Sequence, residues 1–345
     1  MNNSIEHLIR PNIRKLIPYS SARDEFKGQA DIFLDANENP FPTGLNRYPD
    51  PLQKAVKKEL AALKKVDEAQ IFLGNGSDEV IDLLIRIFCE PQQDHIIQLP
   101  PTYGMYRVCA DIANVAVVDI PLNKRFLPDV PAILAKASAQ SKLLFLCSPN
   151  NPSGNSFALS DIQALAAEFP GIVVVDEAYI DFSAQASCLG LLDQCPNLVV
   201  MQTFSKAWGM AGIRLGMAFA SPAIIQLFNK VKPPYNINQL TQQTVLQALK
   251  KAAQKEAWVK QIISERSMLQ HYLGSLDYIE RIYPSDANFI LVKMQAPRRV
   301  YDFLMEQGII VRDRSNVLLC EGCLRITIGT PEENEKLFEA LVQFS

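Results

Sequence analysis

A lysine in an apolar, glycine-rich stretch is the first residue of this sequence that could do chemistry. Lys206 lies within Thr203–Met217, TFSKAWGMAGIRLGM, and Arg214 follows it eight positions later. If the fold buries this lysine, desolvation lowers the pKa of its amine, because burial disfavours the charged form. A neutral amine can act as a nucleophile or carry a proton. The stretch alone fits a surface lysine equally well.

Two segments would suit a ligand that carries an anion or a flat ring. Gly74–Asp78, GNGSD, lies between a predicted strand and a predicted helix, and a helix N-terminus offers free N–H groups to an anion. The same residues fit a plain turn in which Ser77 or Asp78 caps the helix. They lack the third glycine of the dinucleotide-binding pattern. Tyr103, after the next strand, could lie over a flat ligand or be an ordinary loop residue.

Two further motifs follow predicted strands, at the end where α/β sheets bind ligands. Asn151 lies in the turn-forming segment Cys147–Gly154, CSPNNPSG. Asp176 ends the apolar run IVVVD. A carboxylate there is costly to bury unless it is paired. It is therefore a solvated strand end or helix cap, a metal ligand, or the partner of a cation.

Two arginines near the C-terminus stand in apolar stretches. Arg312 lies in IIVRD and Arg325 in LRITI. A long cation in such a stretch needs an anionic partner, or it extends its charged end into solvent while its stem packs on the rim. The sequence leaves both possibilities open for each arginine.

The composition limits the class of function. The chain has 345 residues, 48% of them apolar, and its net charge of −3 gives no basic surface for nucleic acid or anionic membranes. No apolar run reaches the roughly 18 residues of a membrane-spanning helix, and the N-terminus does not resemble a secretory signal. We therefore expect a cytoplasmic protein.

Histidines and cysteines argue against a metal centre. Three histidines are few for a His-rich catalytic metal site or a serine–histidine hydrolase. The seven cysteines are scattered and odd in number, which indicates reduced thiols rather than a disulfide framework. The CxxC formed by Cys320 and Cys323 lacks a second cysteine pair or nearby histidines, so we predict no zinc site there.

Short apolar runs that alternate with amphipathic stretches predict an α/β fold with a mostly parallel sheet. The predicted strands are Gln70–Leu73, Asp94–Leu99, Ala116–Ile120, Leu143–Cys147, Ile172–Asp176, Leu198–Thr203 and Gly216–Ala220. Predicted helices between them include Ser77–Cys89, Tyr103–Ile112, Val130–Lys136 and Ser160–Glu168.

The pattern changes after about residue 222, and the chain divides into three predicted parts. Asn238–Leu273 is predicted as one long helix, and the remainder mixes strands with helices, which indicates a smaller α+β domain. The predicted strands are Phe289–Lys293, Ile309–Arg312 and Leu324–Ile328, and the helices are Pro297–Gln307 and Glu332–Phe344. We predict an N-terminal arm at 1–28, a large domain at 29–240 and a small C-terminal domain at 241–345.

Taken in chain order, these motifs resemble those of pyridoxal-phosphate enzymes of the aspartate-aminotransferase fold (fold type I). The resemblance runs from about Asn12 to the C-terminus. Within this superfamily, the motifs resemble those of the histidinol-phosphate aminotransferase family most. It rests on Leu34–Pro40 (LDANENP), Arg47–Pro49 (RYP), Cys147–Gly154, Val173–Tyr179, Thr203–Arg214 and Cys323–Gly329. Aromatic aminotransferases and an O-phospho-threonine decarboxylase share much of the pattern. The fold implied has a large domain with a mixed, mostly parallel sheet flanked by helices, and a smaller α+β domain.

The resemblance implies a pyridoxal 5'-phosphate cofactor, which acts as an electron sink. Lys206 matches the residue that bonds covalently to the cofactor's aldehyde and then moves a proton. Asp176 would pair with the ring N–H. Tyr179 and Asn151 would hydrogen-bond the ring oxygen, and Tyr103 would stack on the ring.

The cofactor's phosphate would bind at the start of the helix after Gly74–Asp78. The resemblance assigns it to the N–H groups of Ser77 and Asp78, the hydroxyls of Thr203 or Ser205, and the guanidinium of Arg214. A carboxylate does not suit an anion site, so we expect the side chain of Asp78 to point away and cap the helix.

The resemblance also implies residues for the substrate and a second subunit. Arg325 matches the arginine that holds the substrate carboxylate, and Arg312 would help it to bind a phosphate instead. Asn37 and Tyr19 match substrate-binding residues of the N-terminal part. Tyr48 matches a residue that reaches the cofactor phosphate of the partner, which implies a homodimer that acts on a small amino donor and a 2-oxo acid.

Overall fold

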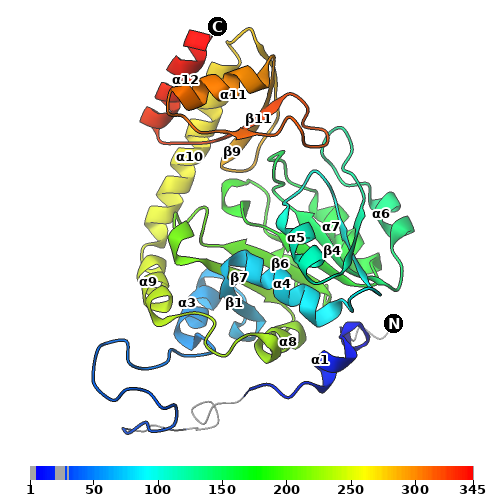
Figure 1. The fold of residues 1–345 in the computed structure, drawn as a ribbon, viewed down its shortest axis with the longest axis vertical. Coiled ribbons are helices and arrows are strands. Elements are labelled where there is room, and N and C mark those ends of the chain that lie inside the picture. Colours follow the sequence, from blue (N-terminus) through cyan, green and yellow to red (C-terminus); the bar gives the residue numbers. More distant parts are fainter. Residues whose placement is uncertain (1–4, 20–27, 29–30, 345) are drawn as a thin grey trace.

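Two sheets of different kinds form the body of the molecule (Figure 1). The computed structural model describes residues 5–19, 28 and 31–344. Within them, the larger sheet has seven strands in the order β1-β7-β6-β5-β4-β2-β3. Its strands are β1 Ile71–Asn75, β2 His95–Gln98, β3 Ala116–Asp119, β4 Ser141–Cys147, β5 Ile172–Asp176, β6 Leu198–Thr203 and β7 Leu215–Ala220. β3, β2, β4, β5 and β6 pair in parallel, and β7 is antiparallel to β1 and β6. The predicted mixed, mostly parallel sheet is confirmed.

The central strands of this sheet are buried on both faces. In β5, Val173 and Val175 pack in the apolar cluster of one face, and Ile172 and Val174 in that of the other. Successive side chains of a strand point to opposite faces, and parallel sheets carry helices on both. The helices of this domain are α3 Lys54–Lys64, α4 Gly76–Phe88, α5 Met105–Ile112, α6 Val130–Lys136, α7 Leu159–Glu168 and α8 Pro222–Val231.

The smaller sheet is antiparallel and is built from the C-terminal part of the chain. In the described residues its order is β10-β11-β9-β8, with β8 Ile279–Ile282, β9 Phe289–Met294, β10 Arg312–Asp313 and β11 Cys323–Thr327. Three helices pack with it around a core of their own: α10 Ala252–Leu273, α11 Pro297–Glu306 and α12 Pro331–Phe344. α9, Gln239–Leu249, precedes α10, which runs from the large sheet to the small one (Figure 1).

Two predicted elements differ from the structure. The helix predicted at 238–273 is two helices, because the N–H of Lys251 turns back to the carbonyl of Ala248 at 2.8 Å between α9 and α10. The strand predicted at 309–312 begins only at Arg312, after Gly308 in the left-handed region with φ of 75°. The sequence patterns also gave no indication of β8, α3 and α8.

The described part of the N-terminus packs in the core, although the sequence predicted an arm at 1–28. The 3-10 helix Ile5–Leu8 and α1, Pro11–Lys15, bury one apolar side against α4, α8 and the sheet. The buried residues are Ile5, Leu8, Ile9 and Ile13, a helical spacing that could have been recognised. The segment 31–50 instead extends away from the body (Figure 1). None of the helices in the described residues is long and apolar enough to cross a membrane.

The strand directions bring the predicted motifs to one edge of the large sheet. β4, β5 and β6 are parallel, so Cys147, Asp176 and Thr203 end their strands at the same edge. β1 runs parallel to β6, since both pair antiparallel with β7. The first turn of α4, which follows β1 directly, therefore lies at this edge too. It is the edge at which α/β proteins bind ligands.

Candidate active site

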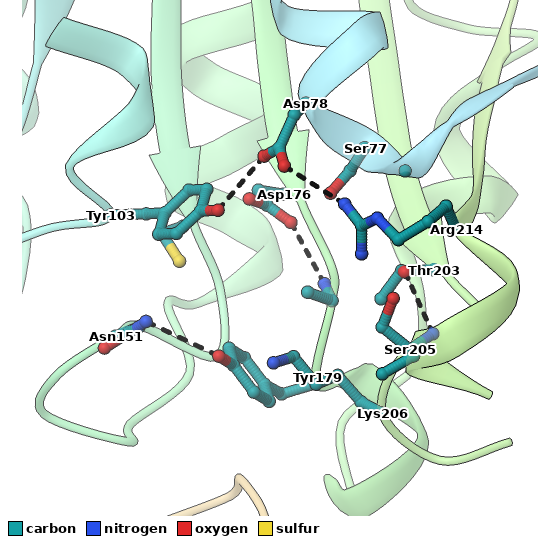
Figure 2. A pocket seen from close by; sticks show the side chains of 14 residues that line it. Ser77, Asp78, Tyr103, Asn151, Asp176, Tyr179, Thr203, Ser205, Lys206 and Arg214 are labelled. Atoms are coloured by element: carbon teal, nitrogen blue, oxygen red, sulfur yellow. Dashed lines mark hydrogen bonds and ion pairs between the residues drawn. The ribbon is translucent and has the colours of Figure 1, made fainter. Parts of the chain in front are cut away.

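A pocket at this edge collects ten of the residues selected from the sequence (Figure 2). They come from the last residues of β5 and β6, from the loops after β2, β4, β5 and β6, and from the first turn of α4. They are Ser77, Asp78, Tyr103, Asn151, Asp176, Tyr179, Thr203, Ser205, Lys206 and Arg214. Gly76, Cys147, Ala178 and Ala211 also line the pocket.

Asp176 is a buried carboxylate with two donors. The hydroxyl of Tyr106 donates to its Oδ2 at 2.8 Å, and the N–H of Ala178 to its Oδ1 at 3.1 Å. Burial raises the pKa of Asp176 to about 6, against the lowering effect of the Tyr106 hydrogen bond. Tyr106 was missed from the sequence. Its only local signal is its place three residues after Tyr103, whose ring it contacts edge to face with centres 5.7 Å apart.

Lys206 projects toward the same space, beside Tyr179 (Figure 2). Its Nζ lies 5.4 Å from the centre of the Tyr179 ring. Burial is the main cause that lowers the pKa of Lys206, followed by the positive charge of Arg325. The lysine is therefore an amine that gives up its proton more easily than an exposed lysine, as the nucleophile interpretation requires.

A short chain of hydrogen bonds connects the two domains at the pocket. The guanidinium of Arg325 donates from Nη1 to Oδ1 of Asn151 at 2.6 Å. Asn151 in turn donates from Nδ2 to the hydroxyl of Tyr179 at 3.4 Å. Arg325 belongs to β11, whereas the other two residues follow strands of the large sheet. Arg325 thus lies close enough to Lys206 for its positive charge to help lower the pKa of the lysine.

The first turn of α4 forms a cradle with the loop before β7. Gly76 has a φ of +73°, and a Cβ added there would lie 2.6 Å from Nη2 of Arg214. A Cβ on Gly216 would overlap the backbone of Gly76 and Ser77. Arg214 itself has a left-handed φ of 53°. These two glycines allow the backbones and the guanidinium to approach closely, which suits an anion at a helix N-terminus.

The expected orientation of Asp78 is wrong. Its side chain points into the pocket, where it accepts from the hydroxyl of Tyr103 at 3.0 Å and lies 3.4 Å from Nη2 of Arg214 (Figure 2). It does not cap α4, whose N-cap is Asn75 without a side-chain cap bond. The physical reason is that the exposed guanidinium of Arg214 and the tyrosine hydroxyl attract the carboxylate more than an N-terminal turn does.

Five selected residues do not line this pocket in the single chain, although one of them, Arg325, bonds to Asn151, which does. Tyr48 and Asn37 line a separate hollow, in which Tyr48 stacks on Tyr235 with ring centres 4.5 Å apart. Tyr19 is 71% exposed. Arg312 is exposed too, but its cross-strand partner on β11 is Arg325.

The side chains in the pocket fit one kind of ligand. The cradle fits an anionic end, the Asp176 carboxylate a ring nitrogen that carries a proton, and the Lys206 amine a reactive carbonyl group. Ala178 and Ala211 also line the pocket, and their small side chains take up little of its volume. Among residues 5–19, 28 and 31–344, no cluster of three or more His, Cys, Asp or Glu side chains could hold a metal ion.

Known proteins share the sequence and the fold over most of the chain. The family model described as "Aminotransferase class I and II" matches residues 34–341. A histidinol-phosphate aminotransferase of Cytophaga hutchinsonii is 53% identical over 342 residues, 98% of each protein. The crystal structure of the histidinol-phosphate aminotransferase of Clostridium acetobutylicum aligns with a TM-score of 0.80 and 26% identity over 87% of this chain and 91% of that one. That of Sinorhizobium meliloti, in complex with pyridoxal-5'-phosphate, has a TM-score of 0.80 and 23% identity over 90% of each chain.

Proposed function

The chain belongs to the class I and II aminotransferases, and we propose that it exchanges an amino group between histidinol phosphate and 2-oxoglutarate. The products are imidazole-acetol phosphate and glutamate, in a step of histidine biosynthesis. The observation that carries this proposal is the 53% identity to a histidinol-phosphate aminotransferase over 98% of both chains. No observation favours the aromatic aminotransferase or the decarboxylase instead.

The cofactor is pyridoxal 5'-phosphate, which supplies, when bound, a ring that withdraws electrons from the carbon bearing the amino group. Asp176 would accept a hydrogen bond from the ring N–H and stabilise its positive charge. Tyr179 and Asn151 would bind the ring oxygen, and Tyr103 would lie against the ring. Their shared pocket supports these roles.

The cofactor's phosphate would lie in the cradle at α4. The N–H groups of Ser77 and Asp78 begin this helix, and a helix N-terminus favours an anion. The hydroxyls of Thr203 and Ser205 and the guanidinium of Arg214 line the same part of the pocket. Phosphate binding would compete with Asp78 for Arg214, because the two anions need the same donor.

Lys206 would bond to the cofactor's aldehyde carbon and later carry the proton removed from the substrate carbon. Nζ must be neutral to accept this proton, and the lowered pKa of Lys206 supports that role. The hydrogen-bonded side chains of Arg325, Asn151 and Tyr179 would cover the pocket and keep water from the reacting atoms.

Arg325 would bind the substrate's anionic group. A guanidinium binds a carboxylate through two parallel hydrogen bonds. Arg312, its cross-strand partner, adds a second positive charge for a phosphate. The pair would therefore accept the carboxylate of glutamate in one half-reaction and the phosphate of histidinol phosphate in the other. Tyr19 and Asn37 stay predictions for the same site.

We also propose a homodimer in which Tyr48 reaches the partner's cofactor phosphate. Tyr48 lies outside the Lys206 pocket of its own chain, near the end of the segment 31–50, where it stacks on Tyr235. This segment exposes apolar side chains, with Ile32 76%, Leu34 87% and Phe41 74% exposed. Exposed apolar side chains that recur within one segment favour burial against another protein surface.

Two further predictions from the sequence stay proposals. The unpaired state of all seven cysteines supports a reducing compartment, so we propose the cytoplasm. The small sheet and its three helices have a core confined to the C-terminal part, which supports a large domain at 29–240 and a small one at 241–345, and limited proteolysis tests these limits.

A panel of half-reactions tests the proposed function. The cofactor-loaded enzyme is mixed separately with histidinol phosphate, glutamate, phenylalanine and O-phospho-threonine, and the cofactor's absorbance is followed. We expect rapid conversion by histidinol phosphate and by glutamate. Rapid conversion by phenylalanine with none by histidinol phosphate would contradict the substrate, and release of carbon dioxide from O-phospho-threonine would contradict the reaction.

Mixing two inactive variants tests the shared site. Tyr48→Ala and Lys206→Ala are denatured together and refolded, with each variant alone as control. In a mixed dimer one site would carry both substitutions and the other neither, so activity should return in the mixture. Activity no greater than that of the separate variants would argue against a site shared between subunits.

A further inference from the structure

Three arginines extend from one face of the small sheet, and one of them was not among the residues selected from the sequence. Arg312 on β10 is the cross-strand partner of Arg325 on β11. The pairing continues beyond β10, since the N–H of Arg314 donates to the carbonyl of Cys323 at 2.9 Å. Cross-strand partners share a face, as do alternate residues of one strand. Arg314 therefore lies on the same face as the other two arginines, diagonally from Arg325.

This face is directed at the Lys206 pocket. Arg325 bonds to Asn151, which lines that pocket, and its guanidinium lies 5.2 Å from the centre of the Phe289 ring. Arg314 is near enough to Arg325 and Tyr179 to interact with both electrostatically. Arg314 therefore lies beside the Lys206 pocket and not on a distant surface.

The arginine face lacks a negative charge of its own. In the part of the chain that the structure describes, none of the three arginines forms an ion pair within 4.0 Å. The neighbouring carboxylate, Asp313, lies between Arg312 and Arg314 in sequence and so on the opposite face, where it accepts from the N–H of Ser315 at 2.8 Å. Like charges opposite one another on a sheet are destabilising.

Two buried side-chain nitrogens of this face have no hydrogen-bond partner among the described residues. They are Nε of Arg314 and Nε of Arg325. Such atoms cost free energy unless a ligand satisfies them. Burial, and then the charges of Arg325 and Arg312, lower the pKa of Arg314, which is the direction expected for a cation held near others. Both observations indicate a site arranged for an anion from solution.

We propose that Arg314 determines specificity for a phosphorylated substrate, by binding the phosphate together with Arg312 and Arg325. A phosphate carries up to two negative charges and three strong acceptor oxygens, which three guanidinium groups can share. Each of the two carboxylates of glutamate carries one charge and two oxygens, which a single guanidinium can bind. Arg314 should therefore matter to histidinol phosphate and little to glutamate. This inference rests on the proposed function and extends it.

The experiment compares half-reactions of cofactor-loaded Arg314→Gln, Arg314→Lys and the unaltered enzyme. Loss of a hydrogen bond to a charged group should raise KM for histidinol phosphate about 10- to 100-fold in Arg314→Gln. The values of kcat, and KM for glutamate and for unphosphorylated histidinol, should change less than about threefold. Arg314→Lys keeps the charge but not the planar fork, so it should recover part of the loss. Arg298→Gln is the control, an exposed arginine of α11 whose Nη2 pairs with Asp302 at 3.0 Å.

Inorganic phosphate gives a readout that does not depend on the substrate. In the cofactor-loaded enzyme the cofactor's own phosphate occupies the cradle at α4. Added inorganic phosphate should therefore compete with glutamate at the arginine face. Arg314→Gln should weaken this inhibition by about tenfold. Unchanged inhibition together with an unchanged KM for histidinol phosphate would overturn the role of Arg314. Equal losses for histidinol phosphate, histidinol and glutamate would also overturn it, as a general defect.

The two proposals can fail separately. If the unaltered enzyme does not convert histidinol phosphate, the proposed function fails, and inhibition by phosphate still decides the role of Arg314. Thermal melting shows whether each variant folds. If Arg314→Gln does not fold, Arg314→Lys carries the test, with an expected rise in KM of about fivefold or more for histidinol phosphate and none for glutamate.

Discussion

Replacing Tyr106 by phenylalanine should move the pH range in which the protein binds its cofactor. Tyr106 is fully buried, and its ring stacks on Phe145 with centres 4.6 Å apart, a contact that phenylalanine keeps. The substitution removes the hydroxyl that donates to Asp176 at 2.8 Å. The carboxylate then keeps one donor among the described residues, the N–H of Ala178.

The size of the shift follows from that one hydrogen bond. A bond to a charged group contributes about 1.5–3 kcal/mol, and one pKa unit corresponds to about 1.4 kcal/mol. Loss of the bond to the carboxylate form should therefore raise the pKa of Asp176 by about 1 to 2 units. In the cofactor-free protein the pKa of Asp176 is already raised by burial to about 6.

In the proposed role, Asp176 would pair with the protonated ring nitrogen only as a carboxylate. Affinity for pyridoxal phosphate should therefore fall as the pH decreases through the pKa of Asp176. This midpoint is expected near 6 in the unaltered protein, and about 1 to 2 units higher in Tyr106→Phe. Ionisation of the free cofactor is common to both proteins, so the difference between them reports Asp176.

The assay is a titration of the cofactor-free protein with pyridoxal phosphate, at intervals from about pH 5 to about pH 9, followed by absorbance and protein fluorescence. Tyr278→Phe is the matched control, because it loses a hydrogen bond of 2.8 Å to the carbonyl of Leu341 in the small domain. Its midpoint should equal that of the unaltered protein. A midpoint in Tyr106→Phe that also equals it would refute the role assigned to this hydrogen bond.

Three other substitutions test the pocket. Lys206→Ala should bind the cofactor only non-covalently and lose turnover by several orders of magnitude, and near-normal rates would rule out the lysine. Gly76→Ala should weaken cofactor binding, since it adds a Cβ 2.6 Å from Nη2 of Arg214 at a φ of +73°; Gly44→Ala, at +81° with nothing within 4 Å, carries only the backbone strain of about 1–2 kcal/mol. Asp176→Asn should stabilise the cofactor-free protein near neutral pH and not below pH 4, because an acid whose pKa rises from 3.8 to about 6 on folding destabilises the fold progressively between these values. The gain, measured by denaturant unfolding, should be up to about 3 kcal/mol.

The large sheet could be predicted because its strands carry a strong local signal. A run such as Ile172–Asp176 has only β-branched residues before its acid, and a strand buried on both faces requires this pattern. Strand β10 has two residues, and its pairing with β11 depends on contacts that no short window contains. The division of 238–273 into α9 and α10 likewise depends on a turn at Lys251, which the amino-acid composition of this segment does not predict.

The candidate site was predictable where a motif follows a strand, and not where tertiary contacts place a side chain. Lys206 and Asp176 were selected because a charged side chain next to an apolar strand is costly to bury unless it has a partner. Tyr106 reads as one more apolar residue of an amphipathic helix, and its bond to Asp176 appears only in the fold. Arg314 lies in the polar stretch RDRSN, and only the register of β10 against β11 places it on the face of Arg325.

The pocket combines features that each oppose stability in the cofactor-free protein. Burial raises the pKa of Asp176 and lowers that of Lys206, so both charged forms are disfavoured where they stand. Arg214 adopts a left-handed backbone, and Nε of Arg325 is buried without a partner among the described residues. A cofactor with a positive ring nitrogen, a reactive carbonyl and a phosphate, together with an anionic substrate, would offset each of these costs in turn. Binding and catalysis would then draw on the same electrostatic arrangement, because the groups that are least stable alone are those that the ligands satisfy.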